Sequence, residues 1–185
     1  IKTNQDGGLL RLIACVCMFI DHAGKMFFPQ LTWMRMVGRL AFPLFAYGIA
    51  VGAAMTRHPR QYIARVAALA LVSQPLYAVA LGHTNKAMYA VPFAQHPLRA
   101  LCTFYMESWE KPSILLALLL GLLLLLCLRE KQYVPALLIY VLCARFSAEL
   151  DYGVSGIGLM VVFYLFLEHP ALCFAASTAY MLVWS

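Results

Sequence analysis

The chain has 185 residues, of which 63% are hydrophobic and only 12% are charged, and its mean hydropathy is +0.78. A water-soluble domain of this size needs far more polar surface, so the composition excludes an ordinary soluble protein and predicts an integral membrane protein. The net charge of +6 does not indicate nucleic-acid binding. The basic residues are scattered through loops that flank apolar segments, where anionic lipids attract them. We therefore expect a lipid bilayer, and no nucleic acid, as a partner.

The six cysteines do not predict a metal site. Cys15-Val16-Cys17 lacks the spacing of a zinc ligand pair, and no second pair with nearby histidines completes a site. Most of the cysteines fall in apolar segments, where cysteine behaves as a small hydrophobic residue. We therefore expect no bound metal.

The apolar segments, taken in chain order, predict an all-α fold, a polytopic transmembrane helix bundle that forms a single domain over residues 1–185. The first segment carries charge and lacks a small-residue cleavage site, so we expect no cleaved signal peptide. The apolar stretch that reaches Ser185 has no polar tail, so the sequence can stop short of the protein's C-terminus. Several segments are shorter than the roughly 20 residues that a perpendicular span needs, as is common where a cavity enters the membrane. About seven helices are expected, over residues 9–28, 34–55, 62–81, 113–128, 133–146, 152–167 and 171–184.

The connections between these segments predict an orientation and one unusual loop. Pro43 and Pro75 fall inside the second and third segments and are expected to kink those helices. Residues 82–112 form a long, partly apolar and aromatic loop, which we interpret as an interfacial or re-entrant element that can cover a site. The densest short basic cluster is at 56–60, and short basic loops usually face the cytoplasm. This places the N-terminus on the cytoplasmic side.

Asp21 and His22 lie near the end of the first apolar segment and are the most informative residues of the sequence. Ionisable groups are costly in hydrocarbon, so they usually face the bundle interior and mark a function. Arg11 precedes His22 by eleven positions, which puts both on nearly one helix face, about 16 Å apart along the axis. Two simpler interpretations stay open: Asp21 and Lys25 can form a surface ion pair, and His22 can be a hydrogen-bonded core residue.

Four segments bring polar residues to the depth of His22. Charges inside a bundle persist by pairing, so Arg39 is expected to pair with Asp151 or Asp21. Gln74 either belongs to this group or satisfies carbonyls that Pro75 leaves free. The remaining histidines, at 58, 83, 96 and 169, lie in loops and are not expected to be functional. The expected cluster comprises Asp21, His22, Arg39, Gln74, Glu149 and Asp151.

Four motifs, in the same order and across nearly the whole chain, resemble the TraX family. They are Leu-Ile-Ala-x-x-x-Met-x-Ile-Asp-His ending at His22, Gly-Arg-x-Ala-Phe-Pro-Leu-Phe-Ala beginning at Gly38, Ser-Gln-Pro beginning at Ser73, and Asp-Tyr-Gly beginning at Asp151. The resemblance implies a multi-pass protein of the bacterial inner membrane that acetylates the N-terminus of a pilin. It also implies acetyl-CoA as donor and His22 as the acid–base centre. The family is similar to larger membrane acyltransferases, which share a basic residue eleven positions before a histidine.

These expectations combine into a mechanism of acetyl transfer across the membrane. His22 is expected to act as general base on an amine or hydroxyl, oriented by Asp21, although a covalent acetyl-histidine is equally compatible with the sequence. Arg39 is expected either to stabilise the oxyanion or to neutralise Asp151. We expect the polyanionic nucleotide of CoA at Arg11, Arg57, Arg60 and Arg65. The acceptor, a pilin or another molecule outside the cytoplasm, is expected to contact Gln74, Glu149 and Tyr152.

Two other classes of function remain compatible with the sequence. Buried Asp, His and Arg on kinked helices also suit a proton-coupled transporter of small solutes, although no internal repeat supports one. A non-catalytic assembly factor for a pilus or conjugation apparatus would not require the shared face of Arg11 and His22. Binding of acetyl-CoA distinguishes the acetyltransferase from both.

Overall fold

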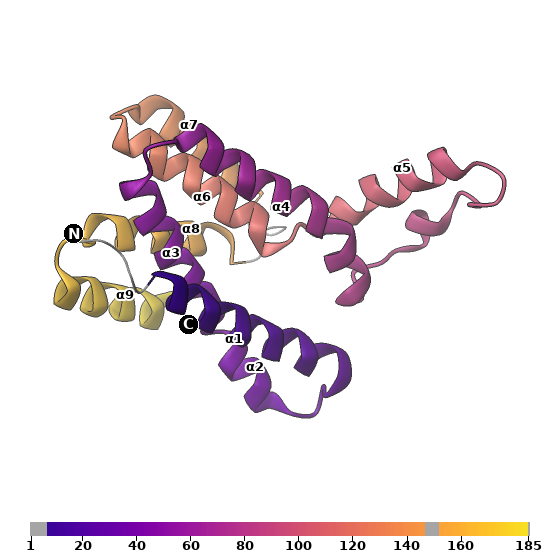
Figure 1. Ribbon diagram of the computed structural model, residues 1–185, viewed down its shortest axis with the longest axis horizontal. Helices are drawn as coiled ribbons and strands as arrows, with labels where there is room; N and C mark the ends of the chain where they lie inside the picture. The colour runs from indigo at the N-terminus through magenta and orange to yellow at the C-terminus, as the bar shows by residue number, and fades with distance from the viewer. Residues whose placement is uncertain (1–6, 147–151, 185) are drawn as a thin grey trace.

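The computed structural model describes residues 7–146 and 152–184, and within these ranges the backbone forms helices and no strand. The predicted all-α fold is confirmed, and each predicted apolar segment is helical (Figure 1). The elements are α1 (Gly7–Phe27), α2 (Thr32–Gly38), α3 (Ala41–Met55), α4 (Pro59–Ala80), η1 (Lys86–Tyr89), α5 (Pro97–Glu107), η2 (Ser108–Glu110), α6 (Ile114–Arg129), α7 (Tyr133–Arg145), α8 (Gly153–Leu165) and α9 (Pro170–Trp184).

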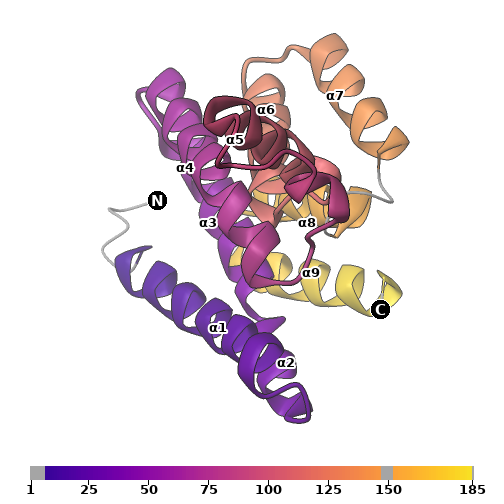
Figure 2. The same cartoon turned by 90° about the vertical axis from the view of Figure 1, so that its right-hand side faces the viewer.

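The core lies where α3, α6 and α8 pack against one another. These helices are apolar around most of their circumference, and their small residues allow close approach, as expected for helices that meet inside a membrane. Gly156 illustrates this, because a Cβ there would lie 2.8 Å from Cζ of Phe42. The remaining helices pack around this core: α4 and α7 contact α6, and α9 contacts α8. The hairpin of α1 and α2 is attached mainly through α3 (Figure 2).

The second predicted helix is divided into α2 and α3, with the break at Arg39 and Leu40. Pro43 explains the position of this break. It has no N–H to donate to the carbonyl of residue 39, and its ring would clash with that carbonyl in a continuous helix. Pro75 has a smaller effect, because α4 continues through it. Arg39 and Leu40 keep helical backbone angles, so α2 and α3 still form one span, and it is the turn at residues 28–31 that sends α2 back along α1.

The apolar surface and helix lengths fit a membrane protein. Among the described residues, three stretches are long and apolar enough to cross a bilayer: α1, α4 and the combined stretch Thr32–Met55. A fourth is possible if Pro97–Glu110 and Ile114–Arg129, which meet at 69°, form one broken span. The helices α7, α8 and α9 are apolar but shorter. Large apolar side chains such as Phe19, Val72 and Leu137 are exposed on the outside, as lipid-facing residues are.

The long loop 82–112 is more regular than expected, because it contains η1, α5 and η2. These elements form an arm that projects from the end of the bundle (Figure 1). Asn85 joins the two ends of the arm: its side-chain oxygen accepts from the N–H of Met88 at 2.9 Å, and its amide donates to Glu107 at 3.2 Å and to Glu110. No residue of α5 lines the cavities described below, whereas residues at the base of the arm do.

Gln74 fastens the base of the arm to α4. Its side chain is completely buried, and its amide nitrogen donates to the carbonyls of Ser108 at 2.6 Å and Lys111 at 3.0 Å. Its amide oxygen accepts from the N–H of Ser113 at 2.8 Å. All three partners are main-chain groups of the turn that leads into α6. The expected substrate contact of Gln74 is thus replaced by a structural role, and the carbonyls that it satisfies belong to this turn rather than to α4.

We expect Gln74→Leu to destabilise the protein strongly. The substitution keeps the side-chain volume but leaves two carbonyls and one N–H of the turn without their partner, at a cost of roughly 2–4 kcal/mol in the free energy of unfolding. Thermal unfolding in detergent, followed by circular dichroism, measures this loss. Ser73→Ala is the matched control, because the Ser73 hydroxyl bonds only weakly, at 3.4 Å, to the carbonyl of Ala70 in its own helix. Equal unfolding temperatures for the two variants would contradict the role of Gln74.

Candidate functional site

Several cavities lie along α1, and the predicted functional residues are grouped in three of them. Arg11 and His22 are both on this continuous helix, as expected. The first cavity, here called the basic cavity, has a volume of about 530 Å³ and lies where the N-terminal ends of α1 and α4 meet the end of α3. Its polar lining consists of Arg11, Arg57, His58, Gln61, Tyr62 and Arg65.

Three of the four arginines expected to bind CoA therefore line one cavity. Arg60 does not, although it lies in the first turn of α4, close to Arg57. Gly52 of α3 faces Tyr62 so closely that a Cβ at position 52 would lie 2.5 Å from the phenol oxygen. Because position 52 is a glycine, the backbone of α3 can lie close to the Tyr62 ring of α4, and both line the basic cavity. The clustering of three guanidinium groups in a cavity is suited to a polyanion.

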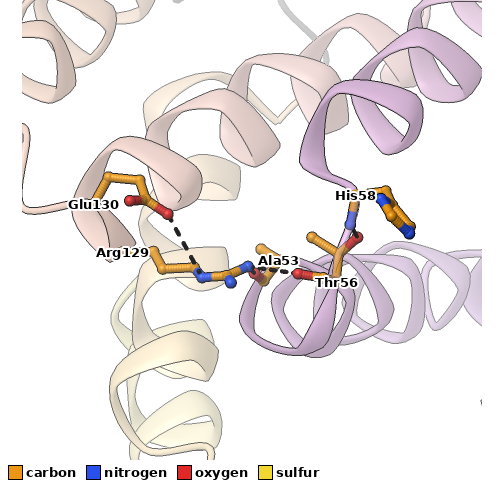
Figure 3. Close-up of polar contacts among 5 residues, drawn as sticks. All are labelled: Ala53, Thr56, His58, Arg129 and Glu130. Carbon is orange, nitrogen blue, oxygen red and sulfur yellow. Dashed lines mark hydrogen bonds and ion pairs between the residues drawn. The ribbon is translucent and has the colours of Figure 1, made fainter.

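Arg129, at the end of α6, holds the turn that lines the basic cavity (Figure 3). Its Nη1 donates to the carbonyls of Ala53 at 3.0 Å and Thr56 at 2.9 Å, and its Nε lies 3.9 Å from the carboxylate of Glu130. The Thr56 hydroxyl in turn accepts from the N–H of His58 at 3.3 Å. A cation at the C-terminal end of α3 also complements the negative end of the helix dipole. The position of the loop arginines is therefore fixed from α6.

The second cavity, here called the polar cavity, lies at the other end of α1 and has a volume of about 330 Å³. It is enclosed by the C-terminal half of α1, by α2 and the start of α3, and by the end of α4. Asp21 and His22 both line it, beside residues of the other helices. Its polar lining consists of Asp21, His22, Lys25, Arg35, Tyr77 and His83, and Tyr152 completes the wall.

Asp21 forms an ion pair with Arg35, with 4.0 Å between Oδ1 and Nε. The pair is close because Gly38 has no side chain, and a Cβ at this position would collide with the carboxylate of Asp21. The prediction that Arg39 pairs with Asp21 is thereby corrected: Arg39 is exposed at the end of α2 and lines none of the three cavities. The turn at residues 28–31 runs α2 back along α1 and thereby brings Arg35 to this place.

Lys25 and His83 are site residues that the sequence interpretation missed. Lys25 Nζ lies 3.2 Å from Nε2 of His83, and the ring of Tyr77 lies 5.6 Å from that imidazole. This contact joins α1 to the segment after α4 across the mouth of the polar cavity. The spacing of Lys25, three residues after His22, places both on one helix face and is the signal that could have included it. His83 had no such signal, because 58 residues separate it from its partner.

The third cavity, here called the apolar cavity, has a volume of about 410 Å³ and lies between α1, α4 and the start of α6. His22 lines it as well, so this imidazole is shared by a polar and an apolar cavity. Most of the remaining lining is hydrocarbon, as in typical binding sites for apolar groups. Representative lining residues are Met18, Met26, Ser73, Leu76, Ser113 and Leu115.

Three further predicted positions complete the comparison with the sequence. Tyr152 lies at the polar cavity, with its ring stacked on Phe42 at a centroid distance of 4.1 Å. Glu149 and Asp151, expected as substrate-binding and catalytic residues, lie outside the described residues. Within the described ranges, no group of three His, Cys, Asp or Glu side chains is placed to hold a metal ion.

The fold and the site define an α-helical membrane protein with an ionisable cluster at one end of its first span. A family model described as TraX protein matches residues 6–185. The chain belongs to the TraX family.

Two relatives differ in how much of the chain they match. The chain is 26% identical, over 86% of its length, to the probable fimbrial assembly protein FimC, serogroup H1, of Dichelobacter nodosus, and covers 60% of that protein. It is 46% identical, over 25% of its length, to the uncharacterized protein RP591 of Rickettsia prowazekii, and covers 18% of it. The chain therefore spans less than two thirds of the length of either relative. No solved structure matches the chain.

Proposed function

We propose that this protein is an acetyltransferase that moves an acetyl group from acetyl-CoA on the cytoplasmic side to an amine or hydroxyl of a pilus-related acceptor. The supporting observation is that α1 carries Arg11 in the basic cavity and His22 in the polar and apolar cavities. The two residues are about 16 Å apart along the helix axis, which is similar to the length of the pantetheine arm. With the N-terminus cytoplasmic and the protein in the inner membrane, a nucleotide at Arg11 would direct its thioester towards His22.

The proposed reaction needs one proton acceptor near the thioester. The acceptor nitrogen or oxygen attacks the acetyl carbonyl, and the imidazole of His22 takes the proton that this atom loses. The tetrahedral intermediate then collapses, the C–S bond breaks, and the CoA thiolate leaves and is protonated by the imidazolium. Asp21 precedes His22 and is held by Arg35, so its negative charge favours the imidazolium that forms during the reaction. We do not assign the oxyanion to Arg39, which is exposed outside these cavities.

The name of the Dichelobacter relative favours a second candidate, a non-catalytic assembly factor for a surface filament. The two candidates differ in one property that the purified protein can show. An acetyltransferase binds acetyl-CoA and hydrolyses it slowly when water replaces the acceptor, whereas an assembly factor does neither.

The first experiment is therefore to measure binding of radiolabelled acetyl-CoA, and release of CoA thiol, with the purified protein in lipid nanodiscs. We expect saturable binding and slow hydrolysis, both competed by free CoA. Empty nanodiscs are the control: if they released as much CoA, the hydrolysis would not be catalysed by the protein. Absence of binding by intact wild-type protein would reject the acetyltransferase and favour the assembly factor.

A further inference from the structure

The apolar cavity contains a hydroxyl group that the fold leaves without a partner. Ser113 is only 3% exposed, and its Oγ has no hydrogen-bond partner among the described residues. Ser113 occupies the N-cap of α6, where serine usually accepts a hydrogen bond from the first helical turn, yet it makes no such bond. The other serine of this cavity, Ser73, bonds to the carbonyl of Ala70. Ser113 lines the apolar cavity, so its unpaired hydroxyl is the polar group of this wall that a bound molecule could satisfy.

The main chain that carries this hydroxyl is held in place by the surrounding structure. The N–H of Ser113 donates to the buried amide of Gln74, which also holds the turn before it. Leaving a buried hydroxyl unsatisfied destabilises a fold, so its retention at a cavity wall is consistent with a bound polar group. His22 lines the same cavity. A molecule that hydrogen-bonds Ser113 can thus present another atom, or the same one, to the imidazole.

The cavity is open to the lipid between α1 and α4. Leu76 on α4 is 69% exposed although it lines the cavity, and Phe19 and Phe27 on α1 are also exposed lining residues. The helix α1 packs against α2 and α3 instead of closing against α4 (Figure 2). A hydrocarbon chain can therefore pass from the membrane into the cavity without entering water. A hydrated acceptor would gain little from these methionine, leucine and phenylalanine walls.

We propose that the apolar cavity binds a membrane-borne amphiphile, with its hydrocarbon part between α1 and α4 and its amine or hydroxyl bonded to Ser113 beside His22. This inference rests on the proposed acetyltransferase function and specifies its acceptor: a nucleophile carried on an apolar segment that enters laterally. Ser113 is then a substrate-binding residue, and Leu76 forms the wall past which the hydrocarbon enters.

The test uses decylamine as the amphiphilic probe, with wild-type protein in lipid nanodiscs. The ratio of N-acetyldecylamine formed to acetyl-CoA hydrolysed is measured for each variant. We expect the ratio to fall about tenfold in Ser113→Ala, the loss expected for one hydrogen bond, and to be restored in Ser113→Thr. Leu76→Trp, which fills the cavity, should lower the ratio at least as much. Val72→Trp is the matched control: Val72 is one turn earlier on α4 and 70% exposed, but it does not line the cavity.

Thermal stabilisation by decylamine provides a second readout that does not depend on catalysis. We expect decylamine to raise the unfolding temperature of wild type and Val72→Trp, but not of Leu76→Trp or Ser113→Ala. Wild-type protein that neither hydrolyses acetyl-CoA nor transfers its acetyl group would overturn the acetyltransferase, while the stabilisation would still support the binding site. Intact hydrolysis with equal transfer ratios and equal stabilisation in all variants would overturn the amphiphile site alone.

Discussion

Replacing His22 with alanine should reduce both acetyl-CoA hydrolysis and acetyl transfer by roughly 10²–10⁴-fold, the usual contribution of a positioned general base. The imidazole lines the polar and the apolar cavity, through which, in the proposed reaction, an acceptor or water would reach the thioester. Acetyl-CoA binding should change little, because the basic cavity lies at the opposite end of α1. Release of CoA thiol and equilibrium binding, measured on the same preparation, separate the two effects.

A second histidine provides the control for this substitution. His96 is exposed before α5 and lines none of the three cavities, so His96→Ala should leave hydrolysis within about twofold of wild type, as for a surface change. Unfolding temperatures of both variants identify any general loss of structure. A folded His22→Ala protein with wild-type hydrolysis would show that the histidine is a structural residue, which is the simpler interpretation of its sequence environment.

The periodicity and composition of the sequence were sufficient to predict most of the fold. Seven apolar segments became helices because hydrophobic runs of this length have few alternatives in a membrane. The break between α2 and α3 could also have been placed from Pro43, since the missing hydrogen bond falls at residue 39. The helix α5 was not expected, because its mixed composition resembles that of an interfacial loop. Its ends are joined by Asn85 to Glu107 and Glu110, contacts that local patterns do not reveal.

The candidate site was predictable only where one helix carries it. Arg11, Asp21 and His22 share α1, so helical geometry alone related them. The partner of Asp21 could not be predicted in this way. To choose Arg35 over Arg39, one must know that α2 runs back along α1 and that Gly38 leaves room for the carboxylate. Contacts between distant segments, such as the bond of Gln74 to Ser108, 34 residues away, depend on tertiary packing. Glutamine is a common ligand-binding residue, but Gln74 is buried and bonds only main-chain groups of the turn before α6.

Removing two arginines from the basic cavity should weaken acetyl-CoA binding by about 100-fold or more. Hydrogen bonds to charged groups contribute about 1.5–3 kcal/mol each, which corresponds to roughly tenfold or more per arginine. Arg11→Gln combined with Arg65→Gln removes one cation from α1 and one from α4, both lining the same cavity. Equilibrium binding of radiolabelled acetyl-CoA at two salt concentrations measures the loss. The salt dependence of the remaining binding should be shallower than that of wild type, because fewer charges meet the phosphates.

Arg60 provides the control that separates an effect of the basic cavity from an effect of the local positive charge. It lies three residues from Arg57 and five from Arg65 and is also exposed, but it does not line the basic cavity. Arg60→Gln should therefore keep acetyl-CoA affinity within about threefold of wild type, since long-range attraction between exposed charges is largely screened at physiological salt. If Arg60→Gln weakened binding as much as Arg11→Gln or Arg65→Gln alone, the nucleotide would be attracted by the basic surface as a whole. A large loss confined to Arg11 and Arg65 would instead mean that CoA binds between the ends of α1 and α4, on the same helix as His22.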